Sequence, residues 1–376
     1  MKPKTEIAAY YFPAWHQCPK NDQWKGVGFT EWELIKAGRP RFPGHRQPLV
    51  PAWGYFDESD PAVMKRACDT AQAHGIDAFL FDWYWYDNGP FLNGAIDRGY
   101  LQLENPATKF AIMWANHTWR DLFPSDGTFP MKHLAWAQVT PEEFVRISDD
   151  WIARYLSHPA YWRIDGAAYV SIFAFDQFVE WMGGVLATRN VLHDFRERAR
   201  RAGAGELHLN VPGAGQVSLD ANPGRLAEMG LDSYTDYNWS RDLPRDLGLR
   251  VPYAKWRAVG QANWSRSLER QPLPFAPNVS MGWDSSTRVS QDIEYVISDW
   301  PLLPVVVDNS PREFGESVRD ALRFVAEHER CAPYITLNAW NEWTEGSYLE
   351  PDTEFGMQYL EAVKAAVEAS RSGAHA

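Results

Sequence analysis

The densest group of side chains that could do chemistry lies near the end of the chain, at residues 338–346 with the sequence NAWNEWTEG. Glu342 and Glu345 stand three residues apart there, beside Trp340 and Trp343. Apolar walls around two neighbouring carboxyl groups push their pKa values apart, so that one group is protonated and the other ionised. An acid paired with a base or a nucleophile is what cleavage of a glycosidic bond requires. We therefore predict that Glu342 and Glu345 are catalytic; the alternative interpretation is a solvated turn whose glutamates cap the final helix.

Aromatic and polar side chains also mix in residues 82–88, DWYWYDN, and residues 114–120, WANHTWR. Rings stack on the apolar C–H faces of sugars, while Asp, Asn and His side chains hydrogen-bond sugar hydroxyls. Any single tryptophan could instead pack beneath a loop, but recurrence after several strands favours a sugar-binding cleft. The predicted cleft lining consists of Trp15, Trp32, Trp83, Trp114 and Trp340, with polar contacts from His45 and Asn116.

Two connecting segments, residues 13–59 and residues 281–312, are long for a compact domain, and loops of that length are usually functional. The first mixes Gly and Pro with Trp, His, Glu and Arg, which predicts an ordered lid. Glu31 and His45 within it are candidate ligand contacts, although a lone histidine is more often a structural group.

The elements that must position these groups are short β-rich runs that alternate with helical patterns, which is typical of parallel βα units. Eight strands, each followed by a helix, predict a (β/α)8 TIM-type barrel whose active site lies at the C-terminal ends of the strands. We predict one domain over residues 1–376. The predicted strands are residues 7–11, 78–81, 110–114, 168–172, 207–211, 233–237, 275–280 and 334–338.

The predicted helices have clear boundary signals. Asp60, followed by proline, predicts a helix start and Gly75 its end. Thr140 and Glu143 have the spacing of a capping box. The last helix is predicted to begin at about Glu354.

Charge and composition exclude several classes of function. The 37 Lys and Arg against 49 Asp and Glu give a net charge of −12, which repels nucleic-acid backbones and anionic lipids. The longest apolar runs are too short for a membrane span or a signal-peptide core, which predicts a cytoplasmic protein. Three cysteines without a CxxC pair argue against a disulfide framework and a structural zinc site.

Motifs for common cofactors are also missing from the sequence. It contains no GxxxxGK[ST], no complete GxGxxG, no GxSxG and no HExxH, and its histidines lack metal-ligand spacing. An Asp-x-Asp triplet, which many metal-dependent nucleotide-sugar transferases use, is absent as well. We predict no metal and no cofactor.

Five segments together resemble the WbsX-like family, which is related to glycoside hydrolase family 99, the endo-α-mannosidases. They are residues 10–13 (YYFP), 28–32 (GFTEW), 44–48 (GHRQP), 114–116 (WAN) and 338–346. The resemblance extends from about residue 7 to residue 352, and the last motif is the specific one.

This resemblance implies a (β/α)8 barrel and a retaining, metal-independent cleavage of α-linked glycans. By the same resemblance, Glu342 deprotonates the sugar's own 2-hydroxyl, which attacks the anomeric carbon to form a 1,2-anhydro sugar, and Glu345 protonates the leaving oxygen. The family 99 hydrolases usually have His where this chain has Thr344, which bears on substrate identity more than on mechanism.

The residues and the resemblance together predict a glycoside hydrolase acting on a polysaccharide that contains mannose or a mannose-like sugar such as rhamnose. Two alternatives are a glycosyltransferase of surface-polysaccharide assembly and a catalytically silent glycan-binding module. The missing Asp-x-Asp triplet counts against the first, and the paired glutamates count against the second. The predicted substrate-binding residues are Tyr11, Trp15, Glu31, Trp32, His45, Gln47, Asp82, Trp83, Trp114, Asn116, Trp119, Trp340 and Asn341.

Overall fold

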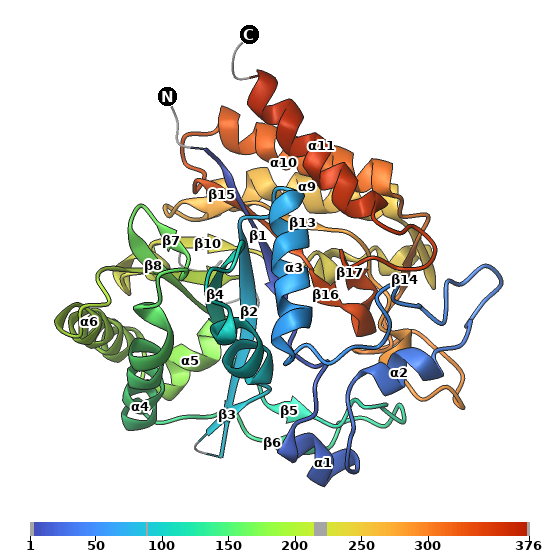
Figure 1. The fold of residues 1–376 in the computed structure, drawn as a ribbon, viewed down its shortest axis with the longest axis horizontal. Coiled ribbons are helices and arrows are strands. Elements are labelled where there is room, and N and C mark those ends of the chain that lie inside the picture. The colour runs from blue at the N-terminus through green and yellow to red at the C-terminus, as the bar shows by residue number, and fades with distance from the viewer. Residues whose placement is uncertain (1–3, 88, 214–223, 374–376) are drawn as a thin grey trace.

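Nine parallel strands form a barrel in the computed structural model, which describes residues 4–87, 89–213 and 224–373 (Figure 1). Two of them, β12 and β13, are halves of one strand interrupted by Pro277, because β12 pairs with β10 and β13 pairs with β15. The Thr336 N–H donates to the Pro277 carbonyl at 2.9 Å, so hydrogen bonding continues across the interruption. The sheet thereby closes and the predicted barrel is confirmed. In order round the barrel the strands are β1 (Glu6–Tyr11), β2 (Ala78–Tyr86), β4 (Lys109–Trp114), β8 (Ala167–Ile172), β9 (Leu207–Pro212), β10 (Ser233–Thr235), β12 (Phe275–Ala276), β13 (Asn278–Ser280) and β15 (Tyr334–Asn338).

The strand positions predicted from the sequence match the observed ones, and only two strands differ from the prediction in length by more than one residue. β2 continues to Tyr86, because its last residues pair antiparallel with β3 (Gly89–Phe91). β10 ends at Thr235, and the chain then turns so that Tyr237 lies beyond the strand end. Residues 7–11 of β1 are buried throughout, as expected of a parallel strand covered on both faces.

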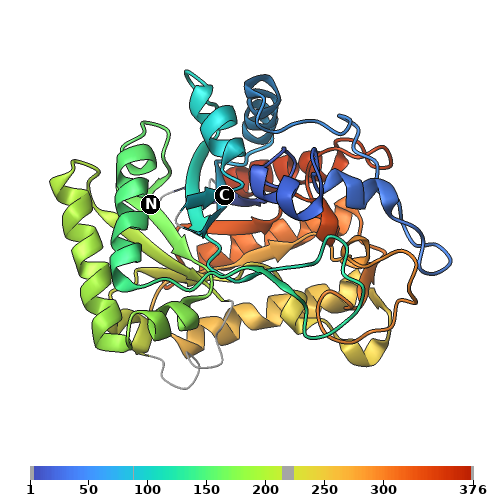
Figure 2. The ribbon, with the colours of Figure 1, turned by 90° about the horizontal axis from the view of Figure 1, so that it is seen from below.

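Helices form the outer layer of the barrel (Figures 1 and 2). α3 (Pro61–Ala73) begins at the Asp60 cap, whose side chain accepts from the Ala62 N–H, and α4 (Pro141–Trp151) begins at the predicted Thr140–Glu143 capping box. α4 lies beside α6 (Val185–Arg201), and Arg198 pairs with Asp149 between them. On another side lie α9 (Tyr253–Arg270), α10 (Pro311–Glu327) and α11 (Gln358–Gly373).

The last helix begins four residues later than predicted. The Asp352 carboxylate accepts hydrogen bonds from the backbone N–H groups of Glu354 and Phe355, and Gly356 has a φ of +54°. These contacts form a separate turn, so the helix begins at Gln358.

The remaining elements are short. None of the helices in the described ranges has the length and apolar content needed to cross a bilayer. The short elements are α1 (Pro19–Lys25), α2 (Trp32–Ala37), η1 (Ala95–Gly99), η2 (Tyr100–Gln102), β5 (Trp119–Arg120), β6 (His133–Ala135), η3 (Ile152–Leu156), β7 (Arg163–Ile164), α5 (Phe175–Trp181), α8 (Arg225–Glu228), η4 (Ser240–Asp242), η5 (Arg245–Leu247), β11 (Arg250–Pro252), η6 (Ser286–Arg288), β14 (Val305–Val307), β16 (Asn341–Glu342), η7 (Trp343–Glu345) and β17 (Ser347–Tyr348).

The two long segments predicted to be functional are ordered and hold each other. Arg41, in the first segment, donates to the carbonyl of Ser290 at 2.8 Å and to that of Ile293 at 2.9 Å, both in the second. The Trp32 ring packs against Trp343, with ring centroids 5.8 Å apart. The first segment is therefore fastened to the residues that carry the paired glutamates.

Candidate active site

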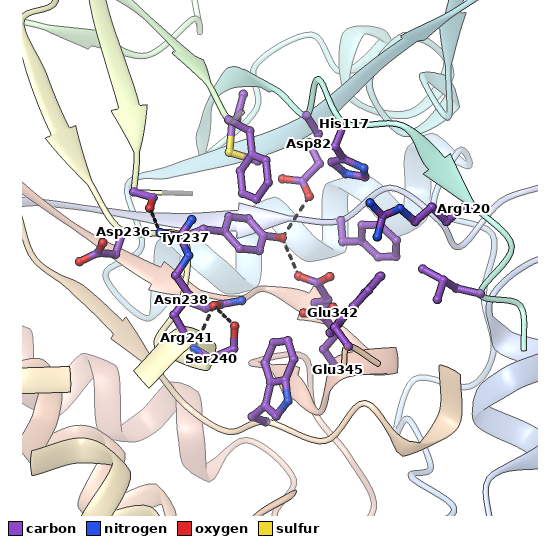
Figure 3. A pocket seen from close by; sticks show the side chains of 18 of the residues that line it. Asp82, His117, Arg120, Asp236, Tyr237, Asn238, Ser240, Arg241, Glu342 and Glu345 are labelled. Atoms are coloured by element: carbon purple, nitrogen blue, oxygen red, sulfur yellow. Dashed lines mark hydrogen bonds between the residues drawn. The ribbon is translucent and has the colours of Figure 1, made fainter. Parts of the chain in front are cut away.

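A cavity of about 810 Å³ opens at the C-terminal ends of the barrel strands (Figure 3). Side chains from most of the strand ends meet in it, as expected for the catalytic face of such a barrel. The lining includes Phe12 after β1, Asp82 and Tyr84 on β2, His117 after β4, Phe173 after β8, Tyr237 after β10, Arg288 after β13, and Glu342 and Glu345 after β15.

Glu342 and Glu345 are held by the way the chain leaves β15. The Trp340 N–H donates to the Tyr10 carbonyl at 2.7 Å, and the Asn341 side chain accepts from the Phe12 N–H at 2.7 Å. The single turn of η7 then brings residues three apart to one side, so both carboxyl groups reach the same cavity wall.

The guanidinium group of Arg288 lies close to three carboxyl groups. Its Nη2 lies 3.3 Å from Glu342 Oε1 and 3.7 Å from Glu31 Oε2, and its Nε lies 3.9 Å from Glu345 Oε1. All four side chains are buried. Burial disfavours the charged guanidinium, yet the three glutamates outweigh it and raise the pKa of Arg288. The cavity therefore contains one permanent positive charge beside three carboxyl groups. A single guanidinium cannot neutralise all three of them.

Because Arg288 cannot neutralise every carboxyl group, the pKa values of Glu342 and Glu345 differ. Burial, followed by repulsion from Glu342, raises the pKa of Glu345 well above its ordinary value. Burial also raises the pKa of Glu342, but Arg288 and hydrogen bonds from Tyr237 and Glu345 oppose that rise. Glu345 is consequently the group that holds a proton, and Glu342 is the group that ionises first.

Tyr237 connects Glu342 to a further carboxyl group. Its hydroxyl lies 2.6 Å from Glu342 Oε2 and 3.0 Å from Asp82 Oδ2 (Figure 3). The ring is fixed by Tyr10, with centroids 4.5 Å apart, and by the edge contact of Phe173 at 5.4 Å. The hydroxyl position is thus set by packing, independently of any ligand.

Glu31 lies behind the cavity wall. It is 1% exposed and is absent from the cavity lining, but it accepts a hydrogen bond from the Thr344 hydroxyl and faces Arg288. Thr344 therefore anchors Glu31. Glu31 therefore positions Arg288. The direct ligand contact that the sequence predicts for Glu31 is not seen, because Glu31 does not line the cavity.

Among the predicted substrate-binding residues, Asp82 and Trp119 line the cavity together with the two glutamates. Tyr11 packs on Phe81 with centroids 4.4 Å apart, and Asn116 exchanges hydrogen bonds with the backbone of Ala174. Asn341 is occupied by the Phe12 backbone. Tyr11, Asn116 and Asn341 thus support the rim and do not line the cavity.

The five tryptophans predicted to line the cleft are buried in the core, which corrects that expectation. Trp83 packs edge-on against Trp151 of α4, and Trp114 stacks on Phe144 of the same helix. Side chains alternate along a strand, so Asp82 and Tyr84 reach the cavity while Trp83 between them faces the helices. The remaining three are at most 3% exposed. Trp15 and Trp32 pack on each other within the long first segment, and Trp340 packs against Trp53 of that segment.

His45 and Gln47 act through Asp284. His45 Nδ1 accepts from the Arg41 N–H at 3.0 Å, so its Nε2 carries the proton and donates to Asp284 at 2.8 Å; Gln47 donates to the same oxygen at 2.7 Å. Burial opposes ionisation of Asp284, but these bonds prevail and lower its pKa. The Asp284 N–H in turn donates to the Glu345 carbonyl at 2.6 Å. His45 and Gln47, predicted to contact the ligand, therefore stabilise the loop beneath Glu345.

Several residues that line the cavity are not among those predicted from the sequence, chiefly Tyr237, Arg288, Tyr84 and Trp283. Tyr237 was the last residue of a predicted strand, a position that points to the catalytic rim. Arg288 lies in the long segment 281–312, whose length alone marked it as functional. His117 also lines the cavity, and burial lowers its pKa to about 4, so it is neutral there.

Comparisons with known proteins identify the family and the fold of the chain. A family model described as Glycosyltransferase WbsX matches residues 7–363. Two curated relatives from strains of Xanthomonas campestris pv. campestris, each named Uncharacterized protein WxcX, are 28% identical to the chain over 374 residues, covering 96% of the chain and 49% of the relative. The chain therefore spans about half the length of these relatives.

Among solved structures, the GH99 endo-alpha-mannosidase from Bacteroides thetaiotaomicron is similar with a TM-score of 0.58 and 14% identity, covering 99% of both chains. A structure described as a glycoside hydrolase-like protein is similar with a TM-score of 0.59 and 16% identity, covering 97% of this chain and 94% of the other. At these identities the likeness establishes a shared fold.

Proposed function

The chain belongs to the family described as Glycosyltransferase WbsX, and from that premise and the chemistry of the cavity we propose that it is a glycoside hydrolase that cleaves an α-linked glycan. One observation carries the proposal. Glu342 and Glu345 share a cavity wall and one guanidinium, while burial and mutual repulsion keep Glu345 protonated. A carboxylate beside a carboxylic acid is the pair that a glycosidase needs.

In the first half of the reaction, Glu342 takes the proton of the 2-hydroxyl on the sugar whose anomeric bond breaks. The 2-oxygen attacks the anomeric carbon, and the Glu345 proton passes to the departing glycosidic oxygen. The products are a free alcohol and a 1,2-anhydro sugar. Arg288 stabilises Glu342 as a carboxylate before the transfer, and the Tyr237 hydroxyl holds its second oxygen.

In the second half, Glu345 is ionised and takes a proton from a water molecule whose oxygen attacks the anomeric carbon. The 2-oxygen leaves that carbon and recovers its proton from Glu342. Each half inverts the anomeric centre, so the overall result is retention, and both glutamates return to their starting states.

This route restricts the sugar, because the 2-oxygen must lie opposite the leaving oxygen. α-Mannosides and α-rhamnosides satisfy that condition, since their two oxygens are axial on opposite faces of the ring. A cavity of about 810 Å³ also exceeds the needs of one sugar ring, being near the upper end of small-molecule sites. We therefore propose a polysaccharide or oligosaccharide substrate with a mannose- or rhamnose-like unit.

The family description favours a second candidate, a glycosyltransferase of polysaccharide assembly. A screen of aryl α-mannosides, aryl α-rhamnosides and bacterial surface polysaccharides, with and without nucleotide sugars, separates the candidates. Hydrolysis in the absence of a nucleotide sugar is the expected result. Turnover that requires a nucleotide sugar would replace the hydrolase by the transferase, and binding without any turnover would identify a glycan-binding protein.

A further inference from the structure

The hydrogen bonds of Tyr237 require a proton on one of its two carboxyl neighbours. A phenol hydroxyl has one hydrogen, and a carboxylate can only accept. The Tyr237 oxygen is nevertheless within hydrogen-bond distance of both Glu342 Oε2, at 2.6 Å, and Asp82 Oδ2, at 3.0 Å. If Tyr237 donates to one of them, the other must itself donate to the Tyr237 oxygen. The three groups therefore share two hydrogens.

The surroundings decide which carboxyl group holds the additional proton. Glu342 faces the Arg288 guanidinium at 3.3 Å through its other oxygen and lies at the shorter distance from Tyr237. Asp82 is 4% exposed, forms none of the ion pairs found in the described part of the chain, and its Oδ1 has no hydrogen-bond partner there. A buried carboxylate that forms no ion pair is far less stable than one in direct contact with a cation.

We propose that Asp82 is a positioning residue that stays protonated through the reaction, donating to the Tyr237 oxygen so that the Tyr237 hydroxyl is committed to the base Glu342. This inference rests on the proposed hydrolase function and adds a residue to it. Asp82 neither gives up nor gains a proton in the cycle. Its protonation keeps a second anion away from Glu342 and fixes the orientation of the Glu342 carboxylate.

The charged and titratable groups that face Asp82 come from five parts of the barrel. They are Tyr84 on β2 itself, Tyr10 on β1, Tyr237 after β10, Arg288 in η6 and Glu342 in β16. Burial and the neighbouring Glu342 both raise the pKa of Asp82, while Tyr237, Tyr84 and Arg288 lower it less. The titration of Asp82 thus agrees with the hydrogen-bond count.

Kinetics of Asp82→Asn and Asp82→Ala test the proposal. The Asn amide can donate to Tyr237 as a protonated Asp does, whereas Ala leaves that oxygen without a donor. We expect Asp82→Ala to lower kcat/KM about tenfold or more, and Asp82→Asn to recover most of that loss, because only the alanine leaves a buried partner unsatisfied. Asp87→Asn, at an exposed aspartate on the same strand end, is the matched control. Equal losses in the two Asp82 variants, or none in either, would overturn the proposal.

The pH profile gives a readout that a merely structural role would not move. The acidic limb of kcat/KM reports ionisation of the base Glu342 in the free enzyme. If Asp82 is already neutral, Asp82→Asn leaves this limb where it is in the wild type. If Asp82 were ionised, removing its charge would move the limb about one pH unit lower, since a like charge raises the pKa of its neighbour. Such a shift would refute the inference.

Infrared spectroscopy tests the protonation state without any substrate. At pH 7 the wild type should show an absorption band from the C=O stretch of a protonated carboxyl group. This band should disappear in Asp82→Asn and persist in Glu345→Gln and Asp87→Asn. If Asp82→Asn instead removes only carboxylate absorption, Asp82 is ionised and the proposal fails. Because this measurement is independent of turnover, it separates failure of the Asp82 inference from failure of the hydrolase proposal.

Discussion

Replacing Glu350 by Gln should make the protein more stable at neutral pH and should flatten its pH dependence. Glu350 is 3% exposed and follows the turn that carries Glu342 and Glu345; its carboxyl group accepts a hydrogen bond from the Trp343 indole at 2.7 Å. Burial raises the pKa of Glu350 to about 8 and Glu58 adds to the rise, while the hydrogen bond from Trp343 and the charge of Arg66 oppose it. The folded protein therefore holds a proton that the unfolded chain releases above its ordinary pKa of 4.5.

The sign and size of the effect follow from this difference in proton binding. Because the folded state binds the extra proton, stability falls as pH rises from about 4.5 to about 8 and then levels off. Each pH unit in that window costs about 1.4 kcal/mol, so the cost grows by about 3 kcal/mol between pH 5 and pH 7. The Gln side chain does not titrate, and its oxygen can still accept from Trp343. Its N–H group needs a new acceptor, which subtracts about 1 kcal/mol at every pH.

Guanidinium unfolding followed by tryptophan fluorescence at pH 5, 6, 7 and 8 measures the effect. The free energy of unfolding of Glu350→Gln, minus that of the wild type, should be near zero or slightly negative at pH 5 and should rise by about 3 kcal/mol by pH 7. Glu361→Gln, at an exposed glutamate on α11, is the control and should follow the wild type at each pH. A difference that stays constant across the pH range would refute the argument that Glu350 is buried in protonated form.

Three further predictions concern the chemistry and the cavity rim. Glu345→Gln should lose action on glycosides with poor leaving groups but keep part of its activity on aryl glycosides with acidic phenols, because a low-pKa leaving group needs little protonation; equal losses on both would deny Glu345 the acid role. Glu342→Gln should be inactive on both kinds of substrate, and the intact enzyme should not turn over a 2-deoxy analogue; turnover at the parent's rate would eliminate the 1,2-anhydro route. Trp136 is 66% exposed on the cavity rim, with its ring edge-on to His133, so Trp136→Ala should raise KM for oligosaccharides and polysaccharides several-fold while leaving kcat/KM on short aryl glycosides nearly unchanged. Leu186→Ala, at a residue 68% exposed on α6, is the control for that variant, and equal effects on long and short substrates would contradict an outer sugar-binding position.

The barrel could be predicted from the sequence because its signals are local. Each strand is a short run of β-branched and aromatic residues, and caps such as Asp60 and Thr140 mark where the intervening helices begin. Differences arose at element ends, where a hairpin partner or a side-chain-capped turn extended or shortened the element. β2 is lengthened by pairing with β3, and α11 is shortened by the turn that Asp352 caps.

The proposed catalytic pair could be predicted for the same reason, since Glu342 and Glu345 lie in one turn of chain. Their partners were not, because Tyr237 and Arg288 come from other strand ends, and no spacing in the sequence relates them to Glu342. The tryptophans show the opposite error, because they were predicted to line the cavity and do not. They are adjacent in sequence to cavity residues, but strand alternation turns Trp83 and Trp114 toward α4.

The protonation pattern of the cavity is a property of the whole rim and not of the NAWNEWTEG segment alone. Two identical glutamates three residues apart have no intrinsic reason to differ. They differ here because Arg288 lies 3.3 Å from Glu342 and 3.9 Å from Glu345, and because Tyr237 reaches only Glu342. Arg288 is in turn flanked by Glu31, which Thr344 anchors, and the loop beneath Glu345 is fixed by Asp284 and His45. The difference in pKa between the two glutamates therefore depends on residues more than fifty positions away in the sequence. For this reason the motif alone predicts a pair of carboxyl groups, and the folded barrel determines which of the two carries the proton.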